Sequence, residues 1–510
     1  MPKDSHLERI SPHEVKISND FEIDVSLYAS ADVPVQASAF DELTQMLELQ
    51  QTVESFAQAS PLSFPDLPRI NRVALTPDFH KARGIPVGTV LETSGFVVPQ
   101  AIGNDVNCGM RLHLTDLSAD KFLASAESLE SACRKMFFEA GRSIPMNRTH
   151  RESLLLGGIT GLYDTVDSNF DEGLWSHFHR QPQEETLSRI EQRGSLAANQ
   201  IFGLEKLLGS YEESNRDSQI GSIGGGNHFV EFQRVEKILD GTVAHAWGLK
   251  VGMTTIMVHT GSVSVGQRCG SFYRDEVRKI YPKAIRHPEN GIFVLPLGER
   301  HAETAEVFWN ALHNAGNFAF ANRMFLALMA WSSLESCFGE LDCPLLYDSP
   351  HNMVWRETRN GKESIIHRKG ASTARGLTEM SNTPFAYYGE PVLVPGSMGA
   401  SSYILAGNGF AGTLSSAAHG AGRALSRGKA MKGFEREFEK FLQEFRIVTP
   451  VDLKRQDIKR RKEIVTKKLA ELKQESPFAY KGIGPVIETI ASAGIARPVA
   501  ELKPLMTIKG

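Results

Sequence analysis

The strongest constraint on the fold of this chain is a set of potential metal ligands that lie far apart in the sequence. Asp105 and Cys108 place a hard oxygen donor and a soft sulfur donor in one glycine-flanked turn. His228, His259 and His351 each lie in a short segment rich in Gly, Ser or Asn, beside an apolar run. Five such side chains could hold two cations, and a thiolate that touches both can bridge them. The chain must then fold so that these segments converge.

Each of these segments also has a simpler structural interpretation. Asp105 and Cys108 can form a turn with a capping aspartate and a small buried cysteine. His259 ends an apolar stretch that reads as a strand, where it can be a core histidine with satisfied hydrogen bonds. Pro350 restricts the backbone ahead of His351 in a similar context. The metal interpretation therefore rests on the five residues together, and such a cysteine and histidine set by itself favours zinc.

A run of three consecutive glycines is followed by side chains suited to bind a nucleotide. Glycine lets backbone N–H groups approach an anion closely, as phosphate-binding loops require. If the segment continues as a strand, its side chains alternate between two faces, with His228 and Val230 on one and Asn227, Phe229 and Glu231 on the other. That alternation would separate metal ligation from nucleotide contacts. A tight turn capped by Asn227 is the structural alternative.

His419 lies in the segment Ser-Ser-Ala-Ala-His-Gly-Ala-Gly-Arg, where its neighbours are too small to shield it. A histidine exposed to phosphate can act as a nucleophile, and attack on an α-phosphorus would give a phosphoramidate that can pass a nucleotidyl group onward. Metal ligation is the competing role for this residue. Asp78 and His80 could orient metal ligands by hydrogen bonds, without binding the metal themselves. An aspartate that follows proline is also a common turn former.

Two further segments are suited to bind phosphate. Residues 367–371 place Arg368 and Lys369 beside an imidazole, in what reads as a loop before a glycine. Two such positive charges suit a phosphate oxygen better than a protein carboxylate, with a solvated turn as the alternative. Residues 395–399, Pro-Gly-Ser-Met-Gly, offer a second cradle of backbone donors.

Composition limits the functions open to the chain. Its 510 residues are 41% hydrophobic, enough for a large core, and the formal net charge of −4 argues against a uniformly basic nucleic-acid coat. Any polyanion site is therefore local, and one basic cluster lies at 454–462, within a stretch at 435–475 that reads as charged helix. Five cysteines without CxxC spacing indicate a reducing, cytoplasmic environment. No window is apolar enough for a membrane span, so no membrane association is expected.

The pattern of apolar residues and glycines predicts a mixed fold. A β-branched run at 85–90 reads as a strand, and residues 251–259 read as a buried strand. Residues 301–340, dense in Ala, Leu, Phe and Met, are typical of a core helix. Residues 1–70 carry no recognisable chemistry, so we expect an N-terminal peripheral segment there and the main domain at 71–510.

Taken in order, these motifs resemble the RtcB family of tRNA-splicing ligases, GTP-dependent enzymes that join an RNA 3′-phosphate or 2′,3′-cyclic phosphate to a 5′-hydroxyl. The similarity runs from about Arg72 to the last residues of the sequence. The matching segments are residues 77–80, 103–110, 224–231, 259–262, 347–352, 367–371, 395–399 and 419–423. The resemblance implies an α+β fold, a single domain with central mixed β-sheets surrounded by helices and a deep metal-containing cleft.

The resemblance implies a role for each residue that matches a functional position of the family. It makes His419 the nucleophile that GTP guanylylates. The ligands it implies for two Mn²⁺ ions, with the cysteine bridging, are Asp105, Cys108, His228, His259 and His351. The residues it places against GMP are Asn227, Phe229, Glu231, Asn352, Ser397, Ala421, Gly422 and Lys509. Glu231 and Lys509 are expected near the guanine, and the glycine-rich loops near phosphate.

The implied function is RNA ligation in tRNA splicing or RNA repair, on RNA with 3′-phosphate or 2′,3′-cyclic phosphate and 5′-hydroxyl ends. An activating protein partner is compatible with this reading but not identified by the sequence. Two alternatives stay open. A binuclear metal phosphodiesterase would trim RNA ends without guanylylation, and a catalytically silent RNA-binding homologue would keep the motifs as scaffold. Retention of His419 and its Gly-Ala-Gly loop favours the ligase, and the intact ligand set argues against the silent homologue.

Several positions depart from the usual family pattern and indicate a divergent paralogue. Ordinary members carry Ser-Arg-Gly after the metal-binding histidine, whereas this chain has Gly-Ser-Val-Ser at 261–264 and lacks the arginine. Ala418 stands where a cysteine is usual before the nucleophile. Asn104 and Asn107 replace apolar or small residues beside the metal pair, and basic residues alter the turn that follows His80.

Overall fold

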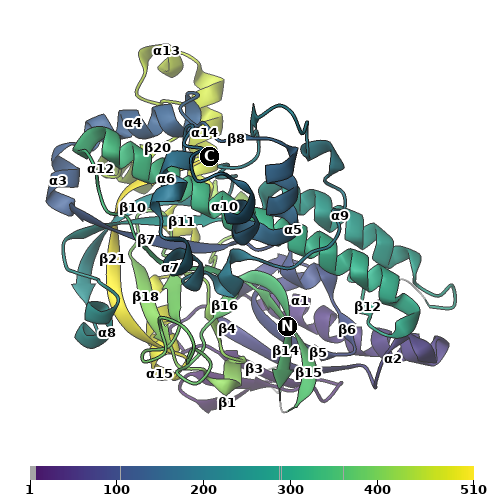
Figure 1. Cartoon of the computed structure of the whole chain (residues 1–510). Coiled ribbons are helices and arrows are strands. Elements are labelled where there is room, and N and C mark those ends of the chain that lie inside the picture. The colour runs from purple at the N-terminus through teal and green to yellow at the C-terminus, as the bar shows by residue number, and fades with distance from the viewer. Residues whose placement is uncertain (1–6, 104, 286–287, 289, 360) are drawn as a thin grey trace.

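Two β-sheets and a layer of helices make up the computed structural model, which describes residues 7–103, 105–285, 288, 290–359 and 361–510 (Figure 1). Asn104, one of the departures noted above, lies outside the described residues. The first sheet has seven strands, antiparallel except for the pair β3 and β4. In spatial order they are β1 (Leu7–Ser11), β2 (Glu14–Ile17), β3 (Asp24–Tyr28), β4 (Arg69–Arg83), β5 (Ile85–Ser94), β15 (Lys362–Lys369) and β14 (Asn352–Arg359).

The second sheet has eight strands and is antiparallel except where β20 joins β21. In spatial order its strands are β13 (Leu345–Pro350), β7 (Gly109–Ser118), β11 (Met253–Thr260), β10 (Phe229–Ile238), β21 (Ala496–Ile508), β18 (Ser402–Gly407) and β17 (Pro391–Val394), with β20 (Ile447–Val448) beside β21. Three two-stranded pairs join β6 (Phe96–Val97) to β12 (Leu295–Pro296), β16 (Ala371–Thr373) to β19 (Ser416–Ala418), and β8 (Pro145–Met146) to β9 (Asn215–Arg216).

The long helix α10 (Ala302–Phe338) forms the centre of the helical layer and is buried along most of its length. It contacts α4, α5 and α9, and it also packs on β7 and β11 of the eight-stranded sheet. The helix carries apolar side chains on nearly every face. It is therefore stable only when other elements pack against it from several sides. The other helices are α1 (Ala37–Leu47), α2 (Leu49–Ala59), α3 (Ala119–Ala124), α4 (Ala126–Phe138), α5 (Arg148–Thr165), α6 (Trp175–Arg180), α7 (Gln183–Ser188), α8 (Gly241–Ala246), α9 (Val263–Lys279), α11 (Arg427–Ala430), α12 (Glu435–Glu444), α13 (Gln456–Lys459), α14 (Lys462–Gln474) and α15 (Ile483–Ser492). The α+β fold with central mixed sheets and surrounding helices is therefore confirmed.

The segment that we expected to be peripheral is built into the seven-stranded sheet. Strands β1 to β3 extend that sheet through the parallel pairing of β3 with β4, and α1 packs on β4 and β5. Buried side chains such as Val25, Leu43 and Phe56 belong to the same hydrophobic core as α10. Gln36, just before α1, donates from Nε2 to the carbonyl oxygen of Ala424 at 2.8 Å. This segment therefore shares the core of the main domain.

The region predicted as one charged helix at 435–475 is divided in the structure. Helix α12 is followed by the short strand β20, which pairs with β21, and only then by α13 and α14. Pro450 follows this strand and lacks the backbone N–H that a continuing helix would need.

No helix among the described residues has both the length and the hydropathy needed to cross a membrane.

Candidate metal centre and nucleophile

Neighbouring strands of the eight-stranded sheet bring the potential metal ligands to one edge. Cys108 directly precedes β7, and Gly109 lies opposite Pro350 of β13, the residue before His351. On its other side β7 pairs with β11, and His259 of β11 lies opposite the first residue of β10. Because paired strands are about 4.8 Å apart, this register places side chains from four distant segments within contact of one another.

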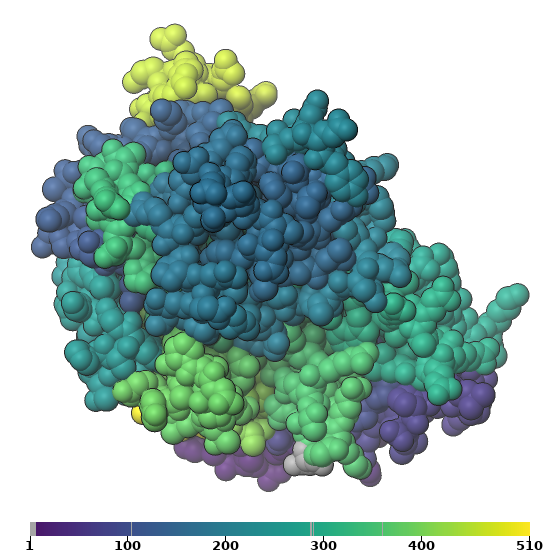
Figure 2. All heavy atoms as spheres, viewed as in Figure 1, coloured from purple at the N-terminus to yellow at the C-terminus, as the bar shows by residue number. Residues whose placement is uncertain are grey.

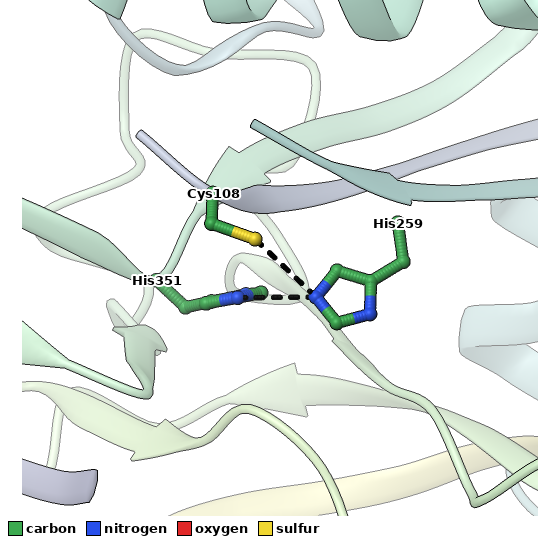
Figure 3. Close-up of side chains that lie close together, drawn as sticks. All are labelled: Cys108, His259 and His351. Carbon is green, nitrogen blue, oxygen red and sulfur yellow. Dashed lines mark hydrogen bonds between the residues drawn. The ribbon is translucent and has the colours of Figure 1, made fainter. Parts of the chain in front are cut away.

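The donor atoms form two groups that share Cys108. In the first group, His259 Nε2 lies 3.5 Å from Cys108 Sγ and 3.3 Å from His351 Nε2 (Figure 3). In the second group, His228 Nε2 lies 3.4 Å from Cys108 Sγ and 2.8 Å from Asp105 Oδ2. Nitrogen, oxygen and sulfur ligands lie about 2.0 to 2.3 Å from a bound ion. Two such ligand atoms are therefore about 3.0 Å apart when the ligand–metal–ligand angle is a right angle, and about 3.5 Å apart when it is tetrahedral. Both groups therefore fit a divalent cation, with the sulfur between them.

Burial sets the protonation of these side chains. It holds the pKa of His259 and that of His351 well below the usual value, so both imidazoles are neutral and keep a lone pair for a cation. Burial, reinforced by Asp105, raises the pKa of the Cys108 thiol, and a bound cation would displace that proton. For Asp105, burial opposes ionisation, but His228 together with hydrogen bonds from Cys108 and the Val263 N–H outweighs it and lowers the carboxyl pKa.

Arg323, in the middle of α10, forms hydrogen bonds or an ion pair with three of the segments that carry the potential ligands. Its Nη1 donates to the carbonyl oxygens of Asn107, at 2.6 Å, and Thr260, at 3.2 Å. Its guanidinium also pairs with Asp348 of β13 at 2.8 Å, and Arg111 pairs with the other carboxylate oxygen at 3.1 Å. All three charged side chains are fully buried. One guanidinium thus fixes the turn before Cys108 and the ends of two strands.

Asn322, the preceding residue of α10, holds the fourth segment. Its side-chain oxygen accepts from the backbone N–H of Ser222 at 3.0 Å, and its Nδ2 donates to the carbonyl oxygens of Ser222 and Gly261. Ser222 begins the glycine loop that leads to His228. Neither residue of this pair was predicted from the sequence, although two consecutive polar residues inside an apolar helical pattern were a visible signal.

Residues 261–264, where the usual arginine is absent, lead into α9, which begins at Val263. Val263 has a φ of +48°, which is unusual for a β-branched residue. Its backbone N–H donates to Asp105 Oδ1 at 3.1 Å. The altered segment therefore still orients one of the potential ligands through its main chain.

His419 is oriented by two acceptors. Its Nδ1 lies 2.6 Å from Asp78 Oδ2 and 2.9 Å from the carbonyl oxygen of Gly370. Since both partners accept, Nδ1 carries the proton, and in the neutral form of the ring the lone pair lies on Nε2. Burial opposes ionisation of Asp78, but hydrogen bonds from His419 and Thr76 outweigh it and hold the carboxyl pKa below its usual value. The ring of His419 lies 4.6 Å from that of His351, measured between centroids.

Asp78 differs from the sequence prediction in both its backbone and its partner. It lies inside strand β4 and not in a turn, and its carboxylate contacts the nucleophile candidate and not a metal ligand. Proline is tolerated at this point because β4 pairs irregularly with β5 between Leu75 and His80.

Gly370 is required by the close approach of the backbone to His419. Its φ is +66°, and a Cβ at this position would clash with Val87 Cγ1 and lie 3.1 Å from the ring of His419. Directly after it, Ala371 of β16 pairs with Ala418 of β19, the residue before His419, which holds the two backbones side by side. Ala418 is itself fully buried, so the usual cysteine is replaced here by a packing residue.

The segment at 367–371 was predicted as a phosphate-binding loop, and this interpretation is wrong for two of its residues. It is mostly strand β15, and His367 and Arg368 are bound inside the protein. His367 Nε2 accepts from a backbone N–H at 2.9 Å, and Arg368 pairs with Glu357 at 3.0 Å. Lys369 and Gly370 line the adjoining cleft, and burial lowers the pKa of Lys369 to about 8.

One cleft of about 1000 Å³ joins the metal-ligand groups to His419. The predicted site residues that line it are Asp105, Cys108, Asn227, His228, Phe229, His259, His351, Asn352, Ser397, His419, Ala421, Gly422 and Lys509. The predicted separation of two faces is wrong, because Asn227 and His228 precede the strand and turn toward the cleft together with Phe229.

Glu231 lies behind the wall of the cleft. Its carboxylate accepts hydrogen bonds from Thr507 and from Gln233 Nε2, and burial raises its pKa to about 7. Thr507 and Lys509, on and just after β21, form the wall in front of it. A side cavity of about 560 Å³ adjoins the same site and is lined by Asp105 and His228 as well as by residues of α14. The ligand groups are therefore reached from two directions.

The sequence matches a known protein family over most of its length. The family described as tRNA-splicing ligase RtcB matches residues 63–510. The tRNA-splicing ligase RtcB of Thermococcus kodakarensis is 30% identical over 497 residues, which cover 94% of this chain and 95% of that protein. The protein of the same name from Nanoarchaeum equitans is 31% identical over 498 residues, covering 94% and 96%. The RNA-splicing ligase RtcB homolog 1 of Entamoeba histolytica is 29% identical over 515 residues, covering 96% and 90%. This chain therefore belongs to the RtcB family.

Proposed function

We propose that this protein is an RNA ligase that joins 3′-phosphate or 2′,3′-cyclic phosphate ends to 5′-hydroxyl ends through a covalent His419–GMP intermediate, with GTP and Mn²⁺. The observation that carries the proposal is the orientation of His419. Asp78 and Gly370 occupy Nδ1 and leave Nε2 as the nucleophilic atom. Relatives named as tRNA-splicing or RNA-splicing ligases support RNA as the substrate.

Two cations would be held by the groups that share Cys108. When bound, they would act as Lewis acids that neutralise charge on phosphate oxygens. The identity of the metal rests on the family resemblance, because the cysteine and histidine donors alone would suit zinc. Metal content measured together with activity decides between the two metals.

In the proposed reaction, His419 Nε2 attacks the α-phosphorus of GTP, a P–N bond forms, and pyrophosphate leaves. The buried carboxylate of Asp78 stabilises the positive charge that develops on the imidazole and keeps Nδ1 protonated. An oxygen of the RNA 3′-phosphate then attacks the guanylate phosphorus and restores neutral His419. Finally the 5′-hydroxyl attacks the activated 3′-phosphate and releases GMP. A cyclic phosphate must first be opened by water.

The walls of the cleft supply groups for the nucleotide. Lys81, Arg83, Lys369 and Arg427 line it and match the negative charge of a triphosphate. Lys509 donates to the carbonyl oxygen of Gly226, which places its ammonium group beside the glycine loop. We propose that Lys509 contacts guanine directly and that Glu231 acts from behind Thr507.

Incubation with α-labelled GTP and Mn²⁺ tests the proposal. We expect a covalent GMP adduct in the wild type and none in His419→Ala. Model RNAs with cyclic-phosphate and 5′-hydroxyl ends should then be joined. Opened but unjoined ends without an adduct would instead identify a phosphodiesterase, and unchanged ends would identify an RNA-binding homologue.

A further inference from the structure

A basic segment projects from the body of the protein away from the sites described above. Residues 454–468 contain eight Lys or Arg and two acidic residues, in a chain whose formal net charge is −4. They cover α13 and the first part of α14. These elements stand out at the top of Figure 1, and the yellow atoms in Figure 2 show that they form an isolated protrusion.

Several cations of this segment are not neutralised by the protein. Lys454 pairs with Glu130 and Arg455 pairs with Asp457, each at 2.8 Å. Four neighbouring cations are exposed and form no ion pair with any acidic side chain that the structure describes; we call them the basic projection: Lys459, Arg460, Arg461 and Lys462. Like charges held this close repel one another, so the arrangement favours a polyanionic partner.

Helix α14 connects the basic projection to the candidate metal centre. It begins at Lys462, and residues of its later turns, including Leu472 and Gln474, line the side cavity that Asp105 and His228 also line. Its 13 residues span about 20 Å at 1.5 Å per residue. At roughly 3.4 Å per stacked nucleotide, that length corresponds to about six nucleotides of an RNA strand.

We propose that the basic projection binds the phosphate backbone of the RNA substrate about six nucleotides from the end that reacts. The inference rests on the proposed function, because it assumes that an RNA end enters at the metal centre. The side cavity holds cations (Arg427, Lys468 and Lys509) and carboxylates (Asp105, Glu471 and Glu475) in equal number. Attraction for the strand therefore comes from the basic projection and not from the cavity.

Binding of labelled single-stranded RNA with a 3′-phosphate, measured by fluorescence anisotropy, tests the proposal. The test variant carries Lys459→Glu, Arg460→Glu and Lys462→Glu. The control variant carries Lys237→Glu, Lys250→Glu and Lys503→Glu, three exposed lysines that line neither the cleft nor the side cavity. Each variant is measured with RNA of about twenty nucleotides and of about four, the shorter being unable to span α14.

For the long RNA, we expect the test variant to bind at least about tenfold more weakly, with the slope of log affinity against log salt shallower by about two. The short RNA and the control variant should bind as the wild type does. Equal weakening by both variants, loss of affinity for the short RNA, or unchanged binding of the long RNA would each overturn the proposal. Polyglutamate that competes as well as long RNA would identify an acidic protein site instead.

Formation of the GMP adduct separates this inference from the proposed function. The test variant should form the adduct at the wild-type rate, because the basic projection lies outside the cleft. Absence of the adduct in the wild type would defeat the proposed function, whatever the binding data show. Normal adduct formation with length-independent binding would defeat only the role of the basic projection.

Discussion

The nucleophile candidate and the metal-ligand groups lie side by side, but the protein satisfies their polar atoms in opposite ways. His419 has its Nδ1 occupied by two protein acceptors, and only Nε2 is left for chemistry. Cys108, His259 and His351 instead direct their donor atoms at one another. The nucleophile candidate has its Nδ1 partners within the protein, whereas the ligand groups would be completed by cations.

The supports behind the two regions differ as well. Asp78 and Gly370, from the seven-stranded sheet and the turn after it, touch the imidazole directly. Asn322 and Arg323, from the core helix, touch only the backbone and Asp348 near the ligands. Changes to the first support should therefore alter reactivity, and changes to the second should alter metal affinity.

Replacement of Cys108 by serine should have the largest effect on metal content. The sulfur is common to both groups, so Cys108→Ser should reduce the bound metal from two ions to near none, whereas His228→Asn should affect mainly the group that contains Asp105. Metal per chain, measured by mass spectrometry after dialysis, checks this. Retention of both ions in Cys108→Ser would show that the sulfur does not bridge.

Loss of Arg323 should destabilise the fold as well as the ligand groups. Arg323→Met leaves a buried carboxylate with one cation fewer, which typically costs about 3–5 kcal/mol of unfolding free energy. Arg323→Lys keeps the charge but cannot form the same set of hydrogen bonds, so it should fold and bind metal more weakly. Chemical denaturation in chelator and metal titration measure the two effects separately. Wild-type metal affinity in Arg323→Lys would contradict the positioning role.

Asp78→Asn should slow formation of the GMP adduct about a hundredfold while the metal content stays unchanged. An amide at this position cannot stabilise the charge that develops on His419, and it can favour the wrong tautomer. Single-turnover rates with labelled GTP provide the measurement. Equal loss of metal and of rate would remove the distinction between the two regions.

Gly370→Ala should combine backbone strain with a clash. We expect a loss of about 1–3 kcal/mol in unfolding free energy, together with a slower adduct reaction, because the added methyl group presses on Val87 and on the ring of His419. Gly252→Ala is the matched control, since its φ of +81° carries similar strain but no atom lies within 4 Å of the added Cβ. Equal effects from both substitutions would assign the loss to backbone strain alone.

The smallest expected effect is a dependence of GTP binding on the charge of Lys509. Burial lowers the pKa of this lysine from 10.5 to about 8, so its ammonium form is present below that pH and is lost above it. GTP affinity, measured in His419→Ala to prevent covalent reaction, should fall several-fold between pH 7 and pH 9. Lys509→Arg should flatten the profile, because arginine stays charged. A flat profile in His419→Ala with Lys509 intact would exclude a direct role for the charge.

The sequence was sufficient to predict the fold class and the set of residues that meet in the cleft. Motif order identified Cys108, His259 and His351, and strand register then explains why they converge. Asp78 was assigned to the wrong partner, because a sequence does not reveal which of two nearby histidines a carboxylate will face. Arg368 was misread because strand pairing, and not local composition, decides that its guanidinium points into the protein.

Long-range contacts explain the other omissions. Arg323 contacts residues more than 200 positions earlier and 25 positions later in the chain, so no local pattern ties it to the ligands. The position of Glu231 behind Thr507 depends on pairing between β10 and β21, which the alternation of side chains along one strand does not predict.

The consecutive placement of Asn322 and Arg323 on the core helix has a thermodynamic consequence. Because two adjacent residues hold all four ligand-bearing segments, the helix cannot leave its packed position without releasing every potential ligand at the same time. Cations that bind only the folded chain would therefore stabilise the whole core by mass action, by about 2.7 kcal/mol at a hundredfold excess over the dissociation constant. Melting temperature should accordingly rise with free metal concentration, and a chelator should lower it.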